Sequence, residues 1–231
     1  MTLRAHKVIN SVDVLAIPQS NAWTKSLAWR ICSPNIDEGN QAERLFLTFP
    51  MSRDPEVIKP HWDSAFQQIG DRLEQGKSVA FLTQGDPMVY STFIYLYEHI
   101  RTHFPKLPID IVPGISSISA VPGVTGIPLV DGQETFAVIP ASYHIDNLRP
   151  YLRQFDSIVL MKVSSVMAPL IEILRDEGLL ACATYVERGT SENQQIISNL
   201  EDVDQSRCVY FSMVIINKKE RAGILAGKAP S

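Results

Sequence analysis

The sequence predicts an α/β protein made of two domains. Short apolar runs bounded by turn residues alternate with segments whose apolar residues recur at helical spacing, an alternation typical of α/β proteins. Near the middle of the chain, a tract rich in Gly, Pro and Ser extends from Gly114 to Gly132 before strand-like sequence resumes. We therefore predict an amino-terminal α/β domain over residues 1–116 and a carboxy-terminal α/β domain over residues 117–231.

Helix signals separate the apolar runs. Apolar residues at helical spacing predict helices within residues 62–73 and 170–174, with Gly76 and Gly178 as stop signals. Residues 18–43 have no clear period, so we expect a long loop or a helical insertion there. The predicted strands are residues 12–17, 44–49, 79–82, 109–112, 135–139, 158–161, 181–186 and 208–216.

Composition limits the classes of function. The chain has 231 residues, of which 45% are hydrophobic and 20% charged, as in ordinary globular proteins. Its formal net charge of -4 argues against a general nucleic-acid binder. Cys32, Cys182 and Cys208 have no short spacing, which argues against a zinc or Cys-x-x-Cys redox site. No apolar run approaches the ~18 residues that span a bilayer, so we expect a cytoplasmic protein without membrane or nucleic-acid partners.

The most informative segment is the turn that follows the third predicted strand. Gly85 permits backbone geometry or a close approach that a side chain would block, and Pro87 fixes the chain as it leaves the turn. Ser91 or Thr92 is suited to cap the next helix. In open α/β sheets, ligands bind beyond the carboxyl ends of the strands, so this turn and Asp86 are expected to face a ligand. Alone, such a turn is a weak motif and is more often an ordinary turn.

A second turn of the same kind follows the predicted strand 109–112. Here the chain passes through Pro113 and Gly114 and then enters a helix through hydroxyl residues, beginning with Ser116 and Ser117. Two such turns on successive parallel strands would lie side by side. Their pairing makes a binding function a stronger interpretation than either turn alone.

The order of these and other motifs resembles the tetrapyrrole methylase family. The similarity covers nearly the whole chain and implies a two-domain α/β fold with the active cleft between the domains, S-adenosylmethionine as methyl donor, and a homodimer. Within the family, the motifs are most similar to those of the branch that methylates C20 of precorrin-2, or its cobalt form, in cobalamin (corrin ring) biosynthesis. The motifs are residues 49–51, 85–92, 112–117, 126–129, 159–162 and 210–212.

The resemblance also implies which residues bind S-adenosylmethionine. Met161 matches a family position that packs on the adenosine, although a core methionine would look the same. Gly189 matches a glycine that closes over the adenine end, with a plain strand-to-loop turn as the alternative. Asp86 is expected either to face the ligand or only to cap a turn. The contacts with the methionine portion are implied at Gln84, Gly85, Asp86, Val89, Ser116 and Ser117.

The substrate implied by the resemblance is a macrocycle that bears many carboxylates, so local cations are needed. Arginine forks match carboxylates best, and solvated surface charges are the alternative for each cation. Tyr90 is a candidate catalytic base only because it follows the cofactor turn. The candidate substrate-binding cations are Arg30, Arg53, Lys59, Lys162 and Arg188.

The sequence gives little support to other chemistry. His99 and His103 stand four residues apart on a predicted helix, which is metal-ligand spacing, but no third ligand is evident and we expect no metal. Methylation at another macrocycle position, or of another substrate, stays open as an alternative. So does a member of the family that binds tetrapyrrole without catalysis.

One departure from the family pattern concerns the amino terminus. Family members open with a strand and a Gly-rich loop before the helix that corresponds here to residues 2–10, where this sequence starts. That segment would supply a sheet strand and one wall of the cofactor cleft. The sequence therefore predicts weak cofactor binding, slow or absent turnover, and self-association through an exposed strand edge.

Overall fold

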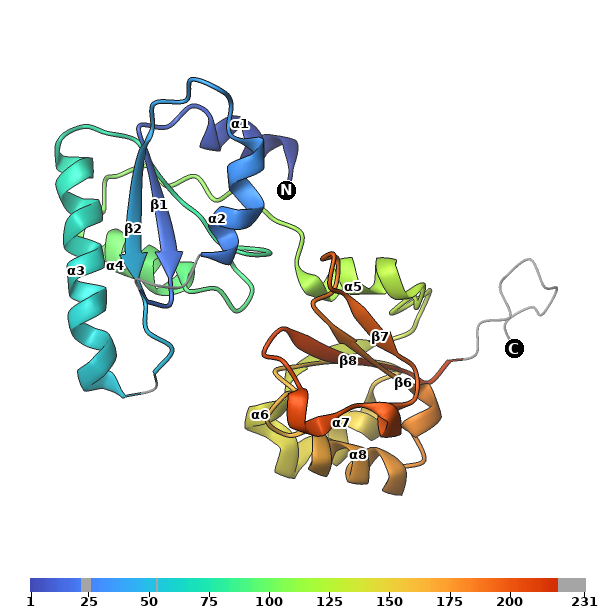
Figure 1. Cartoon of the computed structure of the whole chain (residues 1–231). Coiled ribbons are helices and arrows are strands. Elements are labelled where there is room, and N and C mark those ends of the chain that lie inside the picture. The colour runs from blue at the N-terminus through green and yellow to red at the C-terminus, as the bar shows by residue number, and fades with distance from the viewer. Residues whose placement is uncertain (22–25, 53, 220–231) are drawn as a thin grey trace. The chain divides into compact units, whose positions relative to one another are not determined.

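The structure, a computed structural model, describes residues 1–21, 26–52 and 54–219 (Figure 1). The chain divides into two compact units, Met1–Ser116 and Ser117–Ser231. Each unit has its own sheet with helices on both faces. Within the described ranges, no helix is long and apolar enough to cross a membrane.

The sheet of the first unit is parallel, with the strand order β2-β1-β3. It consists of β1 (Val14–Gln19), β2 (Glu43–Thr48) and β3 (Val79–Phe81). The first four residues of the central strand β1 are fully buried. A parallel strand covered on both faces needs such a continuous apolar run, so the sequence pattern of β1 fits its place in the sheet.

Helices cover both faces of this sheet because successive side chains of β1 point to opposite sides. Val14 and Ala16 pack against α3 and α4, whereas Leu15 and Ile17 pack on the side of α1 and α2. Asp54 caps the start of α3 by accepting a hydrogen bond from the Glu56 amide. The helices of this unit are α1 (Leu3–Ile9), α2 (Leu27–Cys32), the short 3-10 helix η1 (Ser33–Asn35), α3 (Pro55–Glu74) and α4 (Phe93–His103).

The sheet of the second unit is mixed, with the order β4-β5-β8-β6-β7. β4 and β5 are parallel, and β8 runs antiparallel to both β5 and β6. β5 and β6 are therefore parallel to each other, and their carboxyl ends lie at the same edge of the sheet. The strands are β4 (Phe136–Pro140), β5 (Ser157–Met161), β6 (Ala183–Glu187), β7 (Gln195–Ile197) and β8 (Ser212–Asn217).

The two faces of this second sheet are covered differently. One face packs against α6, α7 and α8 through the larger core cluster, and the other packs against α5 through Val121 and neighbouring residues. Short 3-10 helices connect the remaining elements. The bounds are α5 (Ser117–Thr125), α6 (Ala141–His144), η2 (Ile145–Asn147), α7 (Leu148–Gln154), α8 (Met167–Asp176), η3 (Leu180–Cys182), η4 (Leu200–Asp202) and η5 (Gln205–Arg207).

The predicted strand at residues 109–112 is wrong, since this described segment belongs to neither sheet. Pro108 and Pro113 flank it and have no N–H to donate to a neighbouring strand, while Ile109 packs against the apolar cluster beside α3 and α4. Ile109 of this apolar run therefore packs against the core, although the segment does not pair with a strand.

Other boundaries also differ from the predictions. Residues 181–182 lie in η3, and residues 208–211 precede β8, which begins at Ser212. The short strand β7 was not predicted. The expected loop or insertion at residues 18–43 includes the last two residues of β1 and the helix α2.

Candidate active site

The loop that follows β3, which we call the Gly85 loop (residues 82–92), is held by its own side chains. Gly85 has a φ of +66°, a conformation that L side chains rarely adopt. Asp86 Oδ1 accepts a hydrogen bond from the Met88 amide at 2.9 Å, and the Val89 amide donates to the Asp86 carbonyl at 3.3 Å. Asp86 therefore does cap its own turn, one of the two roles that the sequence left open.

A second loop, the Gly114 loop (residues 113–116), lies against the first. The Gly114 amide donates to Asp86 Oδ2 at 3.0 Å. A Cβ atom at Gly114 would lie only 1.9 Å from the Gly85 carbonyl oxygen, so no side chain fits there. The structure thus brings the two turns together as predicted, although residues 109–112 do not form the strand on which that prediction was based.

The end of the Gly85 loop is fixed by hydroxyl groups. Ser91 Oγ accepts from the Phe93 amide at 3.1 Å and lies 2.8 Å from Thr83 Oγ1. Ser91 rather than Thr92 therefore caps the start of α4, because the Thr92 side chain makes no capping bond. Tyr90, the candidate base, has a φ of +51° and is 49% exposed.

The paired loops carry exposed apolar side chains. Met88, Val89 and Tyr90 on the Gly85 loop and Ile115 on the Gly114 loop are all exposed, and Ile115 is 57% exposed. Gln84 is exposed as well, and Ser116 is partly buried. Clustered apolar side chains on a surface commonly mark a binding site, so the paired loops are the candidate ligand site of this unit.

In the second unit, Met161 and Lys162 lie at the carboxyl end of β5. Met161 is partly buried and packs against the apolar cluster that contains Val121. Lys162 has a φ of +57°, and its Nζ lies 5.1 Å from the centroid of the Tyr143 ring. Packing explains Met161 as a core residue, and the cation–π contact gives Lys162 a local role.

Gly189 lies in the loop after β6, at the same sheet edge. A Cβ atom at this position would lie 2.7 Å from Val121 Cγ2, so helix α5 leaves no room for a side chain. The glycine is thus required by packing within the second unit. Ser117, the first residue of α5, is partly buried.

The remaining predicted cations differ in their surroundings. Arg30 in α2 and Lys59 in α3 are exposed, whereas Arg53 lies outside the described residues. Arg188 has a φ of +47°, and its Nη1 lies 3.7 Å from Glu187 Oε1. Arg188 therefore has an acidic neighbour at the edge of the second sheet.

A buried polar pair next to Arg188 was not predicted. The Tyr185 hydroxyl donates to Glu187 Oε2 at 3.1 Å, and the two residues are 1% and 8% exposed. Burial is the main reason that the pKa of Tyr185 is raised above its usual value. The i, i+2 spacing within β6 places both residues on one face of the sheet, but the predicted strand ended at residue 186 and left Glu187 outside it.

The two histidines of α4 are packed in a ring stack. The His99 ring stacks on Phe66 at a centroid distance of 3.8 Å, and His103 stacks on His99 at 4.1 Å. His103 Nδ1 also lies 2.9 Å from the His99 carbonyl oxygen. Among the residues that the structure describes, no group of three or more His, Cys, Asp or Glu side chains is placed to hold a metal ion.

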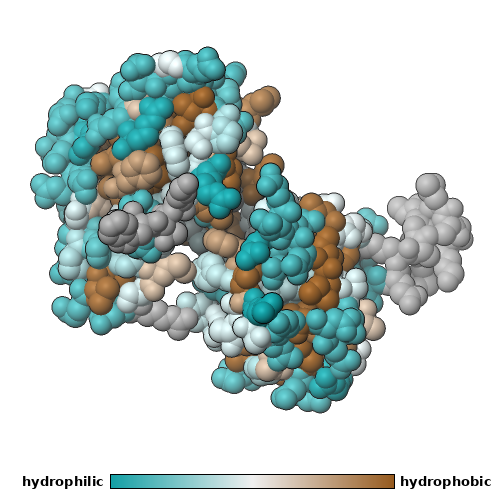
Figure 2. Space-filling view, in the orientation of Figure 1, coloured by the Kyte–Doolittle hydropathy of each residue, from teal (hydrophilic) through white to brown (hydrophobic). Residues whose placement is uncertain are grey.

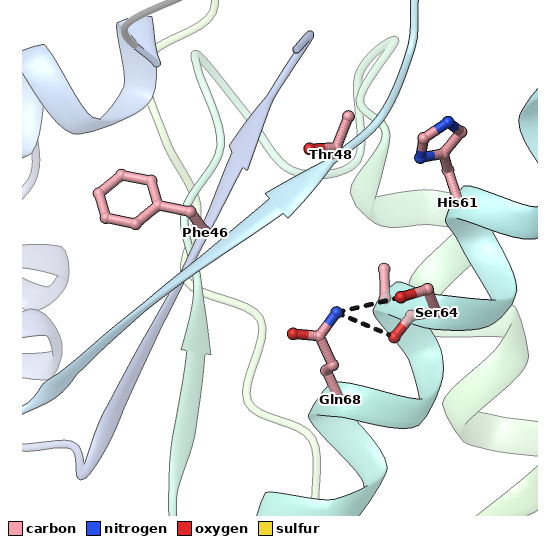
Figure 3. Close-up of a pocket in the computed structure, with 6 residues that line it drawn as sticks. Phe46, Thr48, His61, Ser64 and Gln68 are labelled. Atoms are coloured by element: carbon pink, nitrogen blue, oxygen red, sulfur yellow. Dashed lines mark hydrogen bonds between the residues drawn. The ribbon is translucent and has the colours of Figure 1, made fainter. Parts of the chain in front are cut away.

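A small hollow of about 160 Å³ lies between β2 and α3, apart from the paired loops (Figure 3). Gln68 lines it and donates from Nε2 to the carbonyl and hydroxyl oxygens of Ser64, one turn earlier in α3, at 3.3 and 3.2 Å. None of the predicted site residues contributes to its lining, so we place the candidate site at the loops. The lining residues are Phe46, Thr48, His61, Ser64, Ala65 and Gln68.

Comparison with known proteins defines the class. The sequence profile of the tetrapyrrole (corrin/porphyrin) methylases matches residues 1–204. The chain therefore belongs to the tetrapyrrole methylase family, as its motifs predict.

Two relatives match over most of their length. A probable cobalt-precorrin-2 C(20)-methyltransferase of Methanocaldococcus jannaschii is 33% identical over 224 residues, which are 96% of this chain and 91% of the relative. The cobalt-precorrin-2 C(20)-methyltransferase of Salmonella typhimurium is 33% identical over 220 residues, 95% of this chain and 91% of that protein.

Solved structures confirm the predicted fold. A cobalt precorrin-4 methyltransferase is similar with a TM-score of 0.69 at 16% identity, covering 94% of this chain and 88% of that one. A uroporphyrin-III C-methyl transferase from Thermus thermophilus, complexed with S-adenyl homocysteine, is similar with a TM-score of 0.59 at 17% identity, covering 94% and 91%.

Proposed function

We propose that this protein transfers a methyl group from S-adenosylmethionine to C20 of precorrin-2 or cobalt-precorrin-2, in cobalamin biosynthesis. The observation that carries the proposal is the packing of the Gly85 loop against the Gly114 loop. The Gly85 carbonyl leaves no space for a Cβ atom at Gly114, and the Gly114 amide donates to the Asp86 carboxylate. It is supported by family membership and by the names of the two relatives that are 33% identical.

The residues of the paired loops fit a methyl donor of this kind. A sulfonium carries positive charge and no N–H or O–H at sulfur, so carbonyl oxygens and apolar side chains suit it better than cations do. Gly85 is exposed and has no side chain, so the Gly85 loop offers main-chain atoms there, and Val89 and Ile115 offer apolar surface. We assign the methionine portion to these loops and the start of α5, with contacts from the main chain of Gln84, Gly85 and Asp86 and from Val89, Ser116 and Ser117.

Residues of the second unit are assigned to the adenosine portion of the methyl donor and to the substrate. We propose that Met161 packs on the adenosine and that Gly189 keeps the adjoining loop close to α5. The macrocycle carboxylates are assigned to Arg30, Arg53, Lys59, Lys162 and Arg188. Lys162 and Arg188 share one sheet edge, since each follows one of the parallel strands β5 and β6.

The methyl donor supplies an electrophilic methyl group, and the electron-rich macrocycle is the carbon nucleophile. The protein contributes mainly orientation, which can supply several kcal/mol of a barrier when reacting atoms are held in line. Tyr90 is the proposed acceptor of the C20 proton, because it lies on the Gly85 loop and is half exposed.

The proposal predicts a product with one added methyl group. Purified protein is incubated with precorrin-2, or its cobalt form, and S-adenosylmethionine labelled at the methyl carbon. Mass spectrometry should show one labelled methyl, and carbon NMR should place it at C20. Label at another carbon would instead support a different position, and cofactor binding without methyl transfer would support a non-catalytic member of the family.

The state of the protein in the cell is part of the same proposal. We propose a cytoplasmic homodimer that acts on a diffusible macrocycle without membrane or nucleic-acid partners. Sedimentation velocity measures the oligomeric state. A single species with the mass of one chain at micromolar concentration would contradict the dimer.

A further inference from the structure

The paired loops have a feature that cofactor contact does not require. Both carboxylate oxygens of Asp86 are used by main-chain amides, one from its own loop and one from the neighbouring loop. We infer that the Asp86 carboxylate and Gly114 form a latch that positions the two loops for the methyl donor, so that the Asp86 side chain is a positioning group and not a ligand contact. This inference rests on the proposed function.

The hydrogen bonds of Asp86 are well suited to this role. Bonds from amides to an ionised carboxylate are stronger than bonds between neutral groups. Oδ1 fixes the shape of the Gly85 loop through Met88, and Oδ2 reaches Gly114, which is 28 positions later in the chain. A single side chain therefore sets both the shape of one loop and its distance from the other.

Glycine packing supplies the second half of the latch. Gly114 has no positive φ, so its backbone conformation does not require glycine. Glycine is required there because neighbouring backbone atoms leave no space for a Cβ atom. By contrast, Gly85 has the positive φ, and a Cβ there would meet the Ser116 Cα at 3.6 Å, an ordinary contact. The two glycines are thus needed for different reasons.

The latch is separate from the packing that holds the unit together. Among the described residues, the apolar core clusters contain no member of residues 83–91 or 113–116. Loosening the loops should therefore change ligand affinity more than global stability. This difference separates a positioning role from a merely structural one.

The same sheet offers a matched control. Asp13, at the amino end of β1, accepts from the Ser78 amide at 2.8 Å and from the Ser78 hydroxyl at 2.6 Å. Like Asp86, it joins two chain segments through a carboxylate, but it lies at the opposite end of the parallel strands. Gly76 is the corresponding control for glycine, because its φ is +76° and a Cβ atom placed there would meet no neighbouring atom within 4 Å.

The test compares Asp86→Asn and Gly114→Ala with the controls Asp13→Asn and Gly76→Ala. Asparagine keeps the acceptor for Met88, but its amide nitrogen cannot accept from Gly114. Calorimetric titration with S-adenosylhomocysteine should show at least a tenfold rise in Kd for both loop variants. The two control variants should have a lower melting temperature than the wild type, while their Kd for S-adenosylhomocysteine stays within about twofold of the wild-type value.

Amide exchange of the ligand-free protein completes the test. NMR should show the Gly114 amide exchanging at least ten times faster in Asp86→Asn than in the wild type. Lower affinity with unchanged exchange would make Asp86 a direct ligand contact, and unchanged affinity in a folded Asp86→Asn variant would leave it only structural. Either result overturns the latch. Failure of the wild type to bind S-adenosylhomocysteine would overturn the proposed function and the latch with it.

Discussion

Single residues at the site show what a sequence motif reports and what it omits. Gly85, Gly114 and Gly189 stand out in the sequence, but the motif does not say why each must be glycine. Gly85 is needed for its positive φ, whereas Gly114 and Gly189 are needed because neighbouring atoms occupy the space of a Cβ. Conformation can be guessed from a turn sequence, but such close contacts depend on residues far away in the chain.

The packing of Gly189 against α5 gives a prediction at this scale. Gly189→Ala places a Cβ atom 2.7 Å from Val121 Cγ2, and Val121 is 3% exposed and branched at Cβ, so it has little freedom to move. We expect a loss of about 1–3 kcal/mol in the free energy of unfolding. Urea denaturation measures this loss.

The matched control for that substitution is Gly123→Ala within α5. No atom lies within 4 Å of the Cβ position there, and alanine favours a helix over glycine by about 0.5–1 kcal/mol. This variant should be slightly more stable than the wild type. Equal stability of the two variants would contradict the packing explanation for Gly189.

Among the structural elements, long periodic segments were predicted best. Helix α3 carries apolar residues at helical spacing and ends just before Gly76, whose φ of +76° suits the stop signal. By contrast, residues 109–112 carry a strand-like pattern without forming a strand, and β7 spans only Gln195–Ile197 with two exposed residues. Strand pairing depends on partners that a local pattern does not contain.

Helix α4 gives a prediction about pH. Burial, together with the nearby His103, lowers the pKa of His99 below its usual 6.5, whereas Asp63 acts in the opposite direction. The folded state therefore binds fewer protons at this group than the unfolded chain does. Stability from neutral His99 is present above pH ~6.5 and is lost as the pH falls through the lowered pKa of the folded state.

Replacing His99 tests this linkage. His99→Phe keeps a ring to stack on Phe66 but cannot be protonated, so its stability should fall less between pH 7 and pH 5 than that of the wild type. His103→Gln removes the second cause of the shift and should give an intermediate dependence. Thermal melts across this pH range measure the effect, and identical slopes for wild type and His99→Phe would exclude it.

For the whole molecule, the sequence predicted the α/β class and the family but not the connections that hold each unit together. Each apolar core cluster belongs to one unit only. On the face that Figure 2 shows, polar residues cover much of the surface of each unit and are interspersed with apolar patches. Ion pairs between helices could not be predicted, because long charged side chains on exposed faces show no pattern that selects a partner.

One such ion-pair network predicts a response confined to the second unit. Arg153 and Arg149 of α7 contact Glu177, just after α8, at 2.9 and 3.0 Å, and their hydrogen bonds lower the pKa of Glu177 from 4.5 to about 2. Because the pKa is lower in the folded state, this stabilisation is present above pH ~4.5 and is lost as the pH falls towards about 2. Glu177→Gln should therefore be less stable than the wild type at pH 7, and the difference should shrink on acidification.

Hydrogen-exchange mass spectrometry of Glu177→Gln at pH 7 should show faster exchange than the wild type in peptides from residues 117–219 and unchanged exchange in peptides from residues 1–116. Equal acceleration in both sets would show that the two units unfold as one.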